Sequence, residues 1–318
     1  MENTLKGKII KSVGGLYSIK ISDEASELDE KIISCRAKGA FRYQSVVPLV
    51  GDNVLIRFDN KSEKDRKAAE GGFVIAEILD RKNSLIRPPL ANLDYIFITM
   101  AASHPSPVLS TVDKLISISE FNKIEPVIVI TKSDLDAEEA NRLSKIYETS
   151  GFTVFIISSV TGDGVDALRQ FANENLASKI AAFAGASGIG KSTLMNALFP
   201  ELDLSTAEIS KKIERGRHTT RYVELFPLSP DRNTGYIADT PGFSMLDFER
   251  FDFFEHEDLP LTMREFLPLI GKCKYTKCSH TKEDGCAIID AVKRGDIPKS
   301  RHESFLEINE TLKAKKKW

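Results

Sequence analysis

The sequence predicts a multidomain α/β protein: a small N-terminal β-barrel, a mostly parallel α/β domain with helices on both faces, and a mainly helical C-terminal domain. Three observations predict this architecture. Runs of alternating hydrophobicity fill residues 1–85, apolar strands alternate with helical segments over residues 86–245, and three of the four cysteines lie together within residues 246–318. We therefore expect three domains with these boundaries.

The composition is that of an ordinary globular chain, and its 318 residues leave room for two or three domains. The formal net charge is -2, so no overall basic field attracts nucleic acid, and such a partner must be met by local patches. The N-terminus lacks an apolar leader, and no segment approaches the roughly 20 apolar residues of a membrane span. We expect a soluble, cytoplasmic protein with no membrane partner.

Five short β-like runs predict the N-terminal domain. They are Gly7–Ile10, Leu16–Ile21, Ile32–Ala37, Asn53–Phe58 and Gly72–Ile78, with a Gly14-Gly15 turn between the first two. Residues 60–71 are charged and poor in apolar side chains, which predicts an exposed loop. Short strands in this number fit an OB-fold, a barrel that often binds RNA or DNA. A β-domain without a ligand fits the pattern equally well.

Beyond Pro88 and Pro89, the pattern changes to α/β alternation. The predicted strands are Leu93–Met100, Pro126–Ile130, Thr153–Ile157, Ile180–Ala184 and Gly235–Ala238. The predicted helices are Val112–Phe121, Ala137–Ser150, Val165–Asn175, Lys191–Phe199 and, at the C-terminus, Ser300–Trp318. Near-continuous apolar strands between helices indicate a mostly parallel sheet that is covered on both faces.

One strand leads into a phosphate-binding motif of the form G-x-x-x-x-G-K-[ST]. This phosphate loop is Gly185-Ala186-Ser187-Gly188-Ile189-Gly190-Lys191-Ser192. Its glycines let backbone N–H groups converge on phosphates. We expect Lys191 to reach the β- and γ-phosphates and Ser192 to ligate Mg²⁺, and we include Thr193 among the nucleotide-binding residues.

The segment Thr131-Lys132-Ser133-Asp134, which we call the base loop, is similar to the N-K-x-D element with which GTPases read guanine. The Asp134 carboxylate can accept hydrogen bonds from guanine N1–H and the 2-amino group, which adenine does not offer, so GTP is favoured over ATP. The stem of Lys132 can lie along the base. Alternatively, Ser133 and Asp134 cap the helix that follows.

Thr131 replaces the Asn of that element, whose amide usually ties the base loop to the phosphate loop, so we expect tightness of binding to suffer more than base selection. The next predicted strand is followed by Ser158-Ser159-Val160, where a GTPase has a loop whose N–H groups meet guanine O6. The base loop precedes the phosphate loop, which is the reverse of the order in ordinary GTPases. The sequence therefore predicts a circularly permuted GTPase.

Asp239-Thr240-Pro241-Gly242 follows an apolar strand and has the D-x-x-G form. We expect Asp239 to join the Mg²⁺ shell through a water molecule and the Gly242 N–H to sense the γ-phosphate. Alone, the motif is weak, since such turns are common.

The segment Arg215–Arg221 lies where switch I belongs, and Thr220, or else Thr219, would complete the Mg²⁺ shell. Phe243 stands where Ras has the glutamine that positions water, which makes His218 a candidate catalytic residue together with Lys191 and Thr220. A solvated loop histidine explains His218 as well. We expect slow hydrolysis until a partner orders this loop.

Cys273, Cys278, His280 and Cys286 supply three thiolates and one imidazole within a short polar segment. This set suits a structural tetrahedral Zn²⁺ and leaves no open position for catalysis by the metal. Binding of the metal would contribute folding energy to the segment. The alternative is a group of unrelated reduced cysteines. Cys35 lies apart and is expected to be a small buried residue.

The chain ends in Lys315-Lys316-Lys317-Trp318, with Lys313 just before. A basic helix end of this kind can contact RNA phosphates. It can equally be a solvated end that complements the helix dipole.

Taken together, these motifs resemble the ribosome small subunit-dependent GTPase A family (RsgA, also called YjeQ). The resemblance covers nearly the whole chain and includes Arg87-Pro88-Pro89, the permuted nucleotide motifs and the cysteine set. It implies an OB-fold, a permuted GTPase that converts GTP to GDP with Mg²⁺, and a C-terminal domain with one Zn²⁺. His218 occupies the place of the family's catalytic switch I histidine, and Thr131 is the main departure.

The resemblance also implies a monomer that binds the small (30S) ribosomal subunit and its rRNA, acts in late maturation, is stimulated by the subunit and leaves it after hydrolysis. Since Asp239–Gly242 leads into the C-terminal domain, loss of the γ-phosphate can alter that domain's pose. Two rival functions stay open at this point: a non-catalytic RNA-binding scaffold and an ATP-dependent P-loop enzyme.

Overall fold

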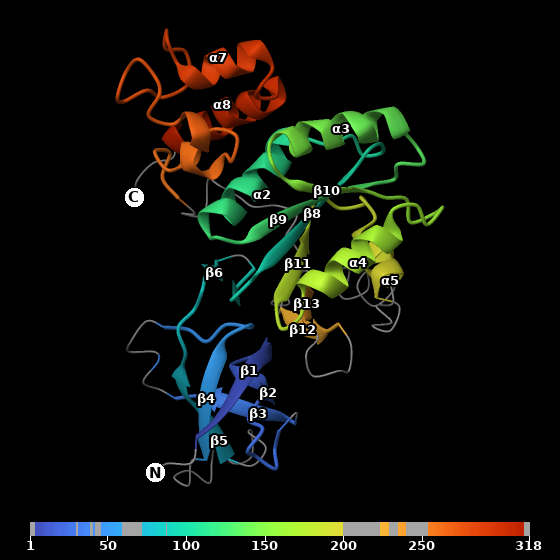
Figure 1. Cartoon of the computed structure of the whole chain (residues 1–318). Helices are drawn as coiled ribbons and strands as arrows, with labels where there is room; N and C mark the ends of the chain where they lie inside the picture. The colour runs from blue at the N-terminus through green and yellow to red at the C-terminus, as the bar shows by residue number, and fades with distance from the viewer. Residues whose placement is uncertain are drawn as a thin grey trace. The chain divides into compact units, whose positions relative to one another are not determined.

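The computed structural model describes residues 4–29, 31–38, 41, 46–58, 72–86, 88–199, 223–228, 235–239 and 254–314. They form two compact units, whose elements are labelled in Figure 1. The first unit holds the described residues up to Leu93, together with Leu176–Ala182 and the strands between Ser210 and Gly242. The second holds Asp94–Asn175 and the described residues of Phe183–Ile209 and Phe243–Trp318. The predicted loop 60–71 lies outside the described residues.

Five strands close the barrel of the first unit. They are β1 (Thr4–Val13), β2 (Leu16–Ile21), β3 (Ile32–Ala37), β4 (Asn53–Phe58) and β5 (Phe73–Ile78). Their order is β1-β2-β3-β5-β4, and β4 pairs back with β1. Only β3 and β5 are parallel among these pairs. A closed barrel of this kind has the architecture of an OB-fold, which confirms the prediction.

The barrel folds because alternate residues of its strands are apolar and point inward. The inward side chains include Ile9, Ile19, Ile56 and Ile75, all fully buried. Cys35 is buried among them as predicted, and burial raises the pKa of its thiol to about 12. Gly14 and Gly15, with φ of +58° and +79°, make the turn between β1 and β2.

β1 extends beyond the barrel. Lys11 lies opposite Glu224 of β12 (Glu224–Pro227), and its Nζ is 2.7 Å from the Glu224 carboxylate. β12 pairs antiparallel with β13 (Tyr236–Asp239), which runs parallel to β11 (Ile180–Ala184) through residues 180–182. One strand therefore serves both the barrel and the sheet beside it.

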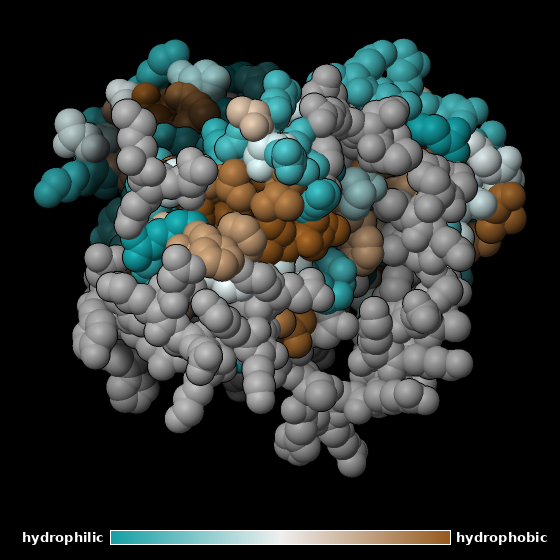
Figure 2. Space-filling model, turned by 90° about the horizontal axis from the view of Figure 1, so that it is seen from below, coloured by the Kyte–Doolittle hydropathy of each residue, from teal (hydrophilic) through white to brown (hydrophobic). Residues whose placement is uncertain are grey.

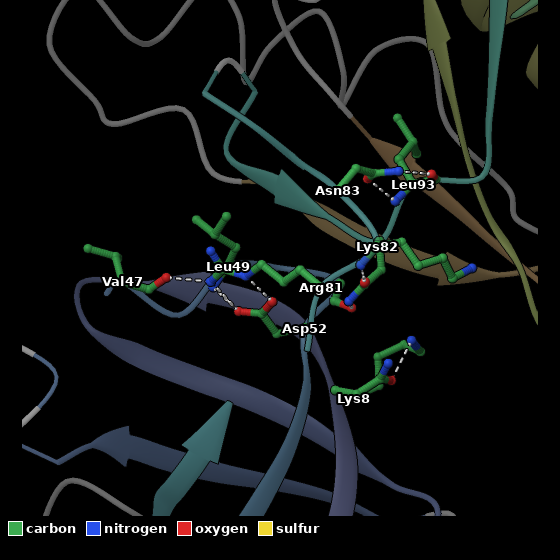
Figure 3. A network of polar contacts seen from close by, with 11 residues as sticks. Lys8, Val47, Leu49, Asp52, Arg81, Lys82, Asn83 and Leu93 are labelled. Carbon is green, nitrogen blue, oxygen red and sulfur yellow. Dashed lines mark hydrogen bonds and ion pairs between the residues drawn. The ribbon is translucent and has the colours of Figure 1, made fainter. Parts of the chain in front are cut away.

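A polar network fixes the segment that follows the barrel to a barrel loop (Figure 3). Arg81 donates from Nε and Nη2 to the two carboxylate oxygens of Asp52, at 2.7 and 2.8 Å. Asp52 is fully buried and also accepts from the Leu49 N–H, while Arg81 donates to the Val47 carbonyl. A bidentate pair on a buried carboxylate holds the exit from the barrel in one geometry.

The predicted domain boundary at Pro88 and Pro89 is a short hairpin. β6 (Ser84–Leu85) and β7 (Leu90–Ala91) pair antiparallel on either side of the prolines. The two prolines cannot donate to a sheet ladder, and they lie in the connection between the paired residues.

The sheet of the second unit contains three parallel strands in the order β10-β9-β8. They are β8 (Tyr95–Ala101), β9 (Glu125–Thr131) and β10 (Thr153–Ile156), with helices α2 (Leu109–Phe121), α3 (Ala137–Thr149), α4 (Val165–Asn175) and α5 (Lys191–Leu198). Phe171 of α4 packs on Phe97 and Phe155. Figure 1 shows α2 and α3 on the other face of these strands, so helices cover both faces, as predicted.

The C-terminal part of this unit is mainly helical, with η3 (Leu259–Thr262), η4 (Leu267–Leu269), α7 (Ala287–Arg294) and α8 (Lys299–Ala314). Its core centres on Phe266, whose ring lies 5.1 Å from that of Phe305. The predicted helix Ser300–Trp318 begins one residue earlier and is described as far as Ala314. Among the described helices, none combines the length and apolar character that crossing a membrane requires.

A buried ion network holds α8 against α2. Arg301 is fully buried, and it donates to Asp113 of α2 and, at 2.7 Å, to Glu265. Burial by itself disfavours the charged guanidinium, but the two carboxylates raise the pKa of Arg301 above its ordinary value. Nearby, Arg264 lies 2.6 Å from Glu120 and 2.7 Å from Glu125. Arg301, which is one of several cations of α8, thus serves packing and is unavailable to RNA.

On the face drawn in Figure 2, hydrophobic residues gather near the middle, and hydrophilic residues lie above them and to the sides. Exposed apolar side chains of the barrel include Ile32, Val47 and Phe58. Some exposure of apolar side chains is normal for a folded chain.

Candidate functional site

The base loop lies against the phosphate loop. Thr131 ends β9, and its hydroxyl Oγ1 is 2.6 Å from the Ile189 carbonyl oxygen and 3.2 Å from that of Met100. Residue 131 therefore does tie the two loops, through a hydroxyl in place of an amide. The hydrogen bond that an Asn amide would make between the loops is therefore supplied by Thr131, and the expected weakening of nucleotide binding stays a prediction.

Lys132 makes a second connection between the loops. Its Nζ donates to the Gly188 carbonyl at 2.9 Å and to the His104 carbonyl. Lys132 has a φ of +56°, a strained value for a residue with a side chain, and the two hydrogen bonds hold it there. The stem of Lys132 consequently spans from the base loop to the middle of the phosphate loop.

Asp134 is exposed and does not cap α3. The N-cap is Asp136, whose Oδ1 accepts from the Glu139 N–H at 2.9 Å. Instead, Asp134 accepts a hydrogen bond of 2.6 Å from the hydroxyl of Ser158. Ser158 is buried, and its own oxygen accepts from the Thr161 N–H at 3.2 Å. This arrangement removes the capping alternative for Asp134, which is exposed to solvent.

The phosphate loop has the backbone that its glycines predict. At Gly185, with φ of +141°, an added Cβ would lie 2.3 Å from the Thr99 carbonyl oxygen, so no other residue fits. Gly188 and Gly190 also have positive φ, of +77° and +93°. The Thr99 hydroxyl donates to the Ala184 carbonyl at 2.7 Å, which fixes the end of β11 beside β8.

Lys191 begins α5 and bends back over the loop. Its Nζ donates to the carbonyls of Gly185 at 2.7 Å and Ala186 at 2.6 Å. Burial lowers the pKa of Lys191 to about 8, since a partly desolvated ammonium is less stable than a hydrated one. A phosphate at this position would supply the missing counter-charge.

Several predicted residues lie outside the description. They are Thr219, Thr220, His218, Gly242 and Phe243, together with the side chains of Ser192 and Asp239. The backbone of Asp239 is described as the last residue of β13. Ser133 and Ser159 are both half-buried, next to Asp134 and Ser158 in their respective loops.

The four predicted metal ligands lie together. The ligand atoms of Cys273, Cys278, His280 and Cys286 are all within 4.8 Å of one another. His280 Nδ1 is 3.6 Å from Cys273 Sγ and 3.5 Å from Cys286 Sγ, and the two sulfurs are 3.8 Å apart. Tetrahedral Zn–S and Zn–N bonds would place the donors about 3.8 Å (S–S) and about 3.6 Å (S–N) apart. The cluster could hold a metal ion, and its spacing fits a tetrahedral one.

Surrounding groups orient these ligands. His302 Nε2 is 2.8 Å from the His280 carbonyl oxygen, and the Ala287 N–H donates to Cys273 Sγ at 3.4 Å. The ring of Phe266 lies against both histidines. Partners of this kind fix ligand geometry in metal sites. The sequence gives no signal for His302, because its contribution depends on how α8 packs.

The carbonyl of His104 is a further contact that sequence reasoning missed. It belongs to the loop after β8 and accepts from Lys132. A backbone acceptor has no sequence signature, so only the structure places it here.

The base loop precedes the phosphate loop along the chain and is hydrogen-bonded to it. This arrangement defines a circularly permuted GTPase. The profile of the RsgA GTPase matches residues 78–249, and that of the RsgA N-terminal domain matches residues 6–64. The chain belongs to the RsgA GTPase family.

Relatives and solved structures agree with this assignment. The small ribosomal subunit biogenesis GTPase RsgA of Bacillus pumilus is 40% identical over 316 residues, which is 98% of each chain. YjeQ from Thermotoga maritima has a TM-score of 0.77 at 28% identity and covers 99% of this chain and 100% of its own. YloQ, described as a circularly permuted GTPase, has a TM-score of 0.73 at 32% identity, with 99% and 97% covered.

Proposed function

We propose that this chain is a GTPase of small ribosomal subunit biogenesis, which binds the 30S subunit and its rRNA late in maturation and leaves after hydrolysing GTP to GDP and phosphate. The observation that carries the proposal is the pair of hydrogen bonds from Thr131 and Lys132 to the phosphate loop, which joins a guanine-type loop to a phosphate-type loop. The full-length similarity to proteins named for this process supports it. A cytoplasmic, monomeric protein is part of the proposal.

The proposed roles follow the loops. Guanine is read by Asp134, with Thr131, Lys132, Ser133, Ser158 and Ser159 around it. The phosphates are held by Gly185–Ser192 and Thr193, and Mg²⁺ by Ser192, Thr220 and, through water, Asp239. Gly242 senses the γ-phosphate, and His218 assists hydrolysis together with Lys191 and Thr220.

We propose Zn²⁺ as the structural metal of the cysteine cluster, because three thiolates and an imidazole at tetrahedral spacing are its preferred ligands. We propose residues 1–85, 86–245 and 246–318 as functional domains: an RNA-binding OB-fold, the GTPase and the zinc domain. The buried Arg301 network packs this C-terminal domain against α2.

The test is GTP turnover, measured as phosphate release, with purified small and large ribosomal subunits added separately. We expect at least about tenfold stimulation by small subunits and none by large ones, with Lys191→Ala as the inactive control. Equal effects of both subunits, or no effect of either, would overturn the proposed partner. Competition of ATP against GTP in the same buffer decides the nucleotide.

A further inference from the structure

Thr131 is buried where the base loop meets the phosphate loop. Its side chain is only 2% exposed. The hydroxyl carries one hydrogen, and both oxygens within reach, those of Ile189 and Met100, are carbonyl acceptors. That hydrogen is therefore used inside the protein, in the hydrogen bond from Thr131 Oγ1 to the Ile189 carbonyl oxygen of the phosphate loop, 2.6 Å away.

Guanine presents two kinds of polar group. Its N1–H and 2-amino groups are donors, and its O6 and N7 are acceptors. Asp134 is exposed and, when ionised, only accepts, so it matches the donor edge. Reading N7 would require a free donor from the protein.

The residue type at position 131 decides whether such a donor exists there. An asparagine amide has two hydrogens, so it could donate to the Ile189 carbonyl and still offer one hydrogen to a ligand. The threonine hydroxyl has none left. The neighbouring side chains also use donors internally, since the Ser158 hydroxyl donates its one hydrogen to Asp134 and Lys132 gives two of its three ammonium hydrogens to carbonyls.

We propose that Thr131 is a positioning residue that locks the base loop onto the phosphate loop, and that this chain selects guanine through Asp134 without reading N7. The inference rests on the proposed function as a guanine nucleotide enzyme. The ligands it predicts are guanosine nucleotides in which N7 is no longer an acceptor, such as 7-deazaguanosine diphosphate, bound as tightly as GDP.

The experiment is equilibrium competition of GDP, 7-deaza-GDP and IDP against a fluorescent GDP on the full chain. We expect the Kd of 7-deaza-GDP to lie within about twofold of that of GDP, and IDP, which lacks the 2-amino donor, to bind at least about tenfold more weakly. A loss of more than fivefold for 7-deaza-GDP with weak IDP binding overturns this inference and leaves the proposed function standing. Failure to bind GDP, or IDP binding equal to GDP, overturns the proposed function itself.

Variants separate positioning from contact. Thr131→Val leaves the Ile189 carbonyl unpaired and should weaken GDP and 7-deaza-GDP by the same factor, roughly 5- to 100-fold. Thr131→Ser should restore both affinities, and Thr131→Asn should raise the ratio of the two Kd values above about five. The exposed Thr149→Val is the matched control and should change neither. A changed ratio in Thr131→Val would show that the hydroxyl contacts the base and would overturn the proposal.

Discussion

Replacing Arg301 by Met should destabilise the second unit by about 3–5 kcal/mol, because it leaves two carboxylates buried without their cation. The side chain of Arg301 is 0% exposed, and those of Asp113 and Glu265 are 1% and 3% exposed. Met has a comparable unbranched stem, so the loss should arise from unpaired charge more than from a cavity. Screening by solvent, which weakens exposed pairs, is small at this depth.

The loss should also depend on pH. Burial raises the pKa of Asp113 even though Arg301 opposes the rise. Without Arg301 that pKa rises further above its value in the unfolded chain. A group whose pKa is higher in the folded state than in the unfolded state stabilises the fold at low pH. That contribution to the free energy of unfolding is lost as the pH rises through the folded-state pKa. The destabilisation should therefore be larger at pH 8 than at pH 5.5, because protonation of the unpaired Asp113 carboxylate becomes more favourable as the pH falls.

The assay is urea unfolding followed by circular dichroism at both pH values, with each variant compared with wild type at the same pH. Because both proteins contain the same cysteine cluster, any effect of its protonation on the free energy of unfolding cancels in that comparison. Arg294→Met is the matched control, since Arg294 is 60% exposed and pairs with Asp296, and it should cost less than about 1 kcal/mol. A loss below about 1 kcal/mol for Arg301→Met, or a larger loss at pH 5.5, would refute the reasoning.

Three further predictions concern the nucleotide and metal sites. Asp134→Asn should weaken GDP at least about tenfold and favour XDP, whose 2-oxo group accepts where guanine donates; unchanged relative Kd values in competition would contradict this. The affinity for GDP should be constant below pH 8 and fall up to about tenfold per pH unit above it, because Lys191, with a pKa of about 8, must be protonated to bind phosphate. Binding titrations with GDP at several pH values check this, and an affinity that stays constant up to pH 9.5 would contradict it. Mass spectrometry of the native protein should find one zinc ion per molecule, and Cys286→Ser should abolish zinc binding and lower the melting temperature. Retention of zinc by that variant would disprove the ligand set.

Much of the fold could be predicted because its signals are local. Alternation in Leu16–Ile21 and Asn53–Phe58 predicts strands whose observed bounds are identical. The amphipathic pattern of Val165–Asn175 likewise gives the observed α4. The phosphate loop and the cysteine cluster were also predictable, since glycines and thiolates at fixed spacing have few other uses.

What could not be predicted depends on contacts between distant residues. The pairing of Lys11 with Glu224 and the closure of the barrel by β4 leave no local pattern. Arg301 looks like one more cation of a basic helix, and only packing reveals that it is buried. Thr131 is similar: the sequence shows a departure from Asn, while the structure shows that its hydroxyl keeps the connection to Ile189.

We propose that the base loop and the phosphate loop form one guanine nucleotide site in permuted chain order. A crystal structure of the chain with GDP and Mg²⁺ tests it most directly. We expect the Asp134 carboxylate within hydrogen-bonding distance of guanine N1 and the 2-amino group, and Lys191 on the β-phosphate. A nucleotide bound with its base away from Asp134 would contradict the claim.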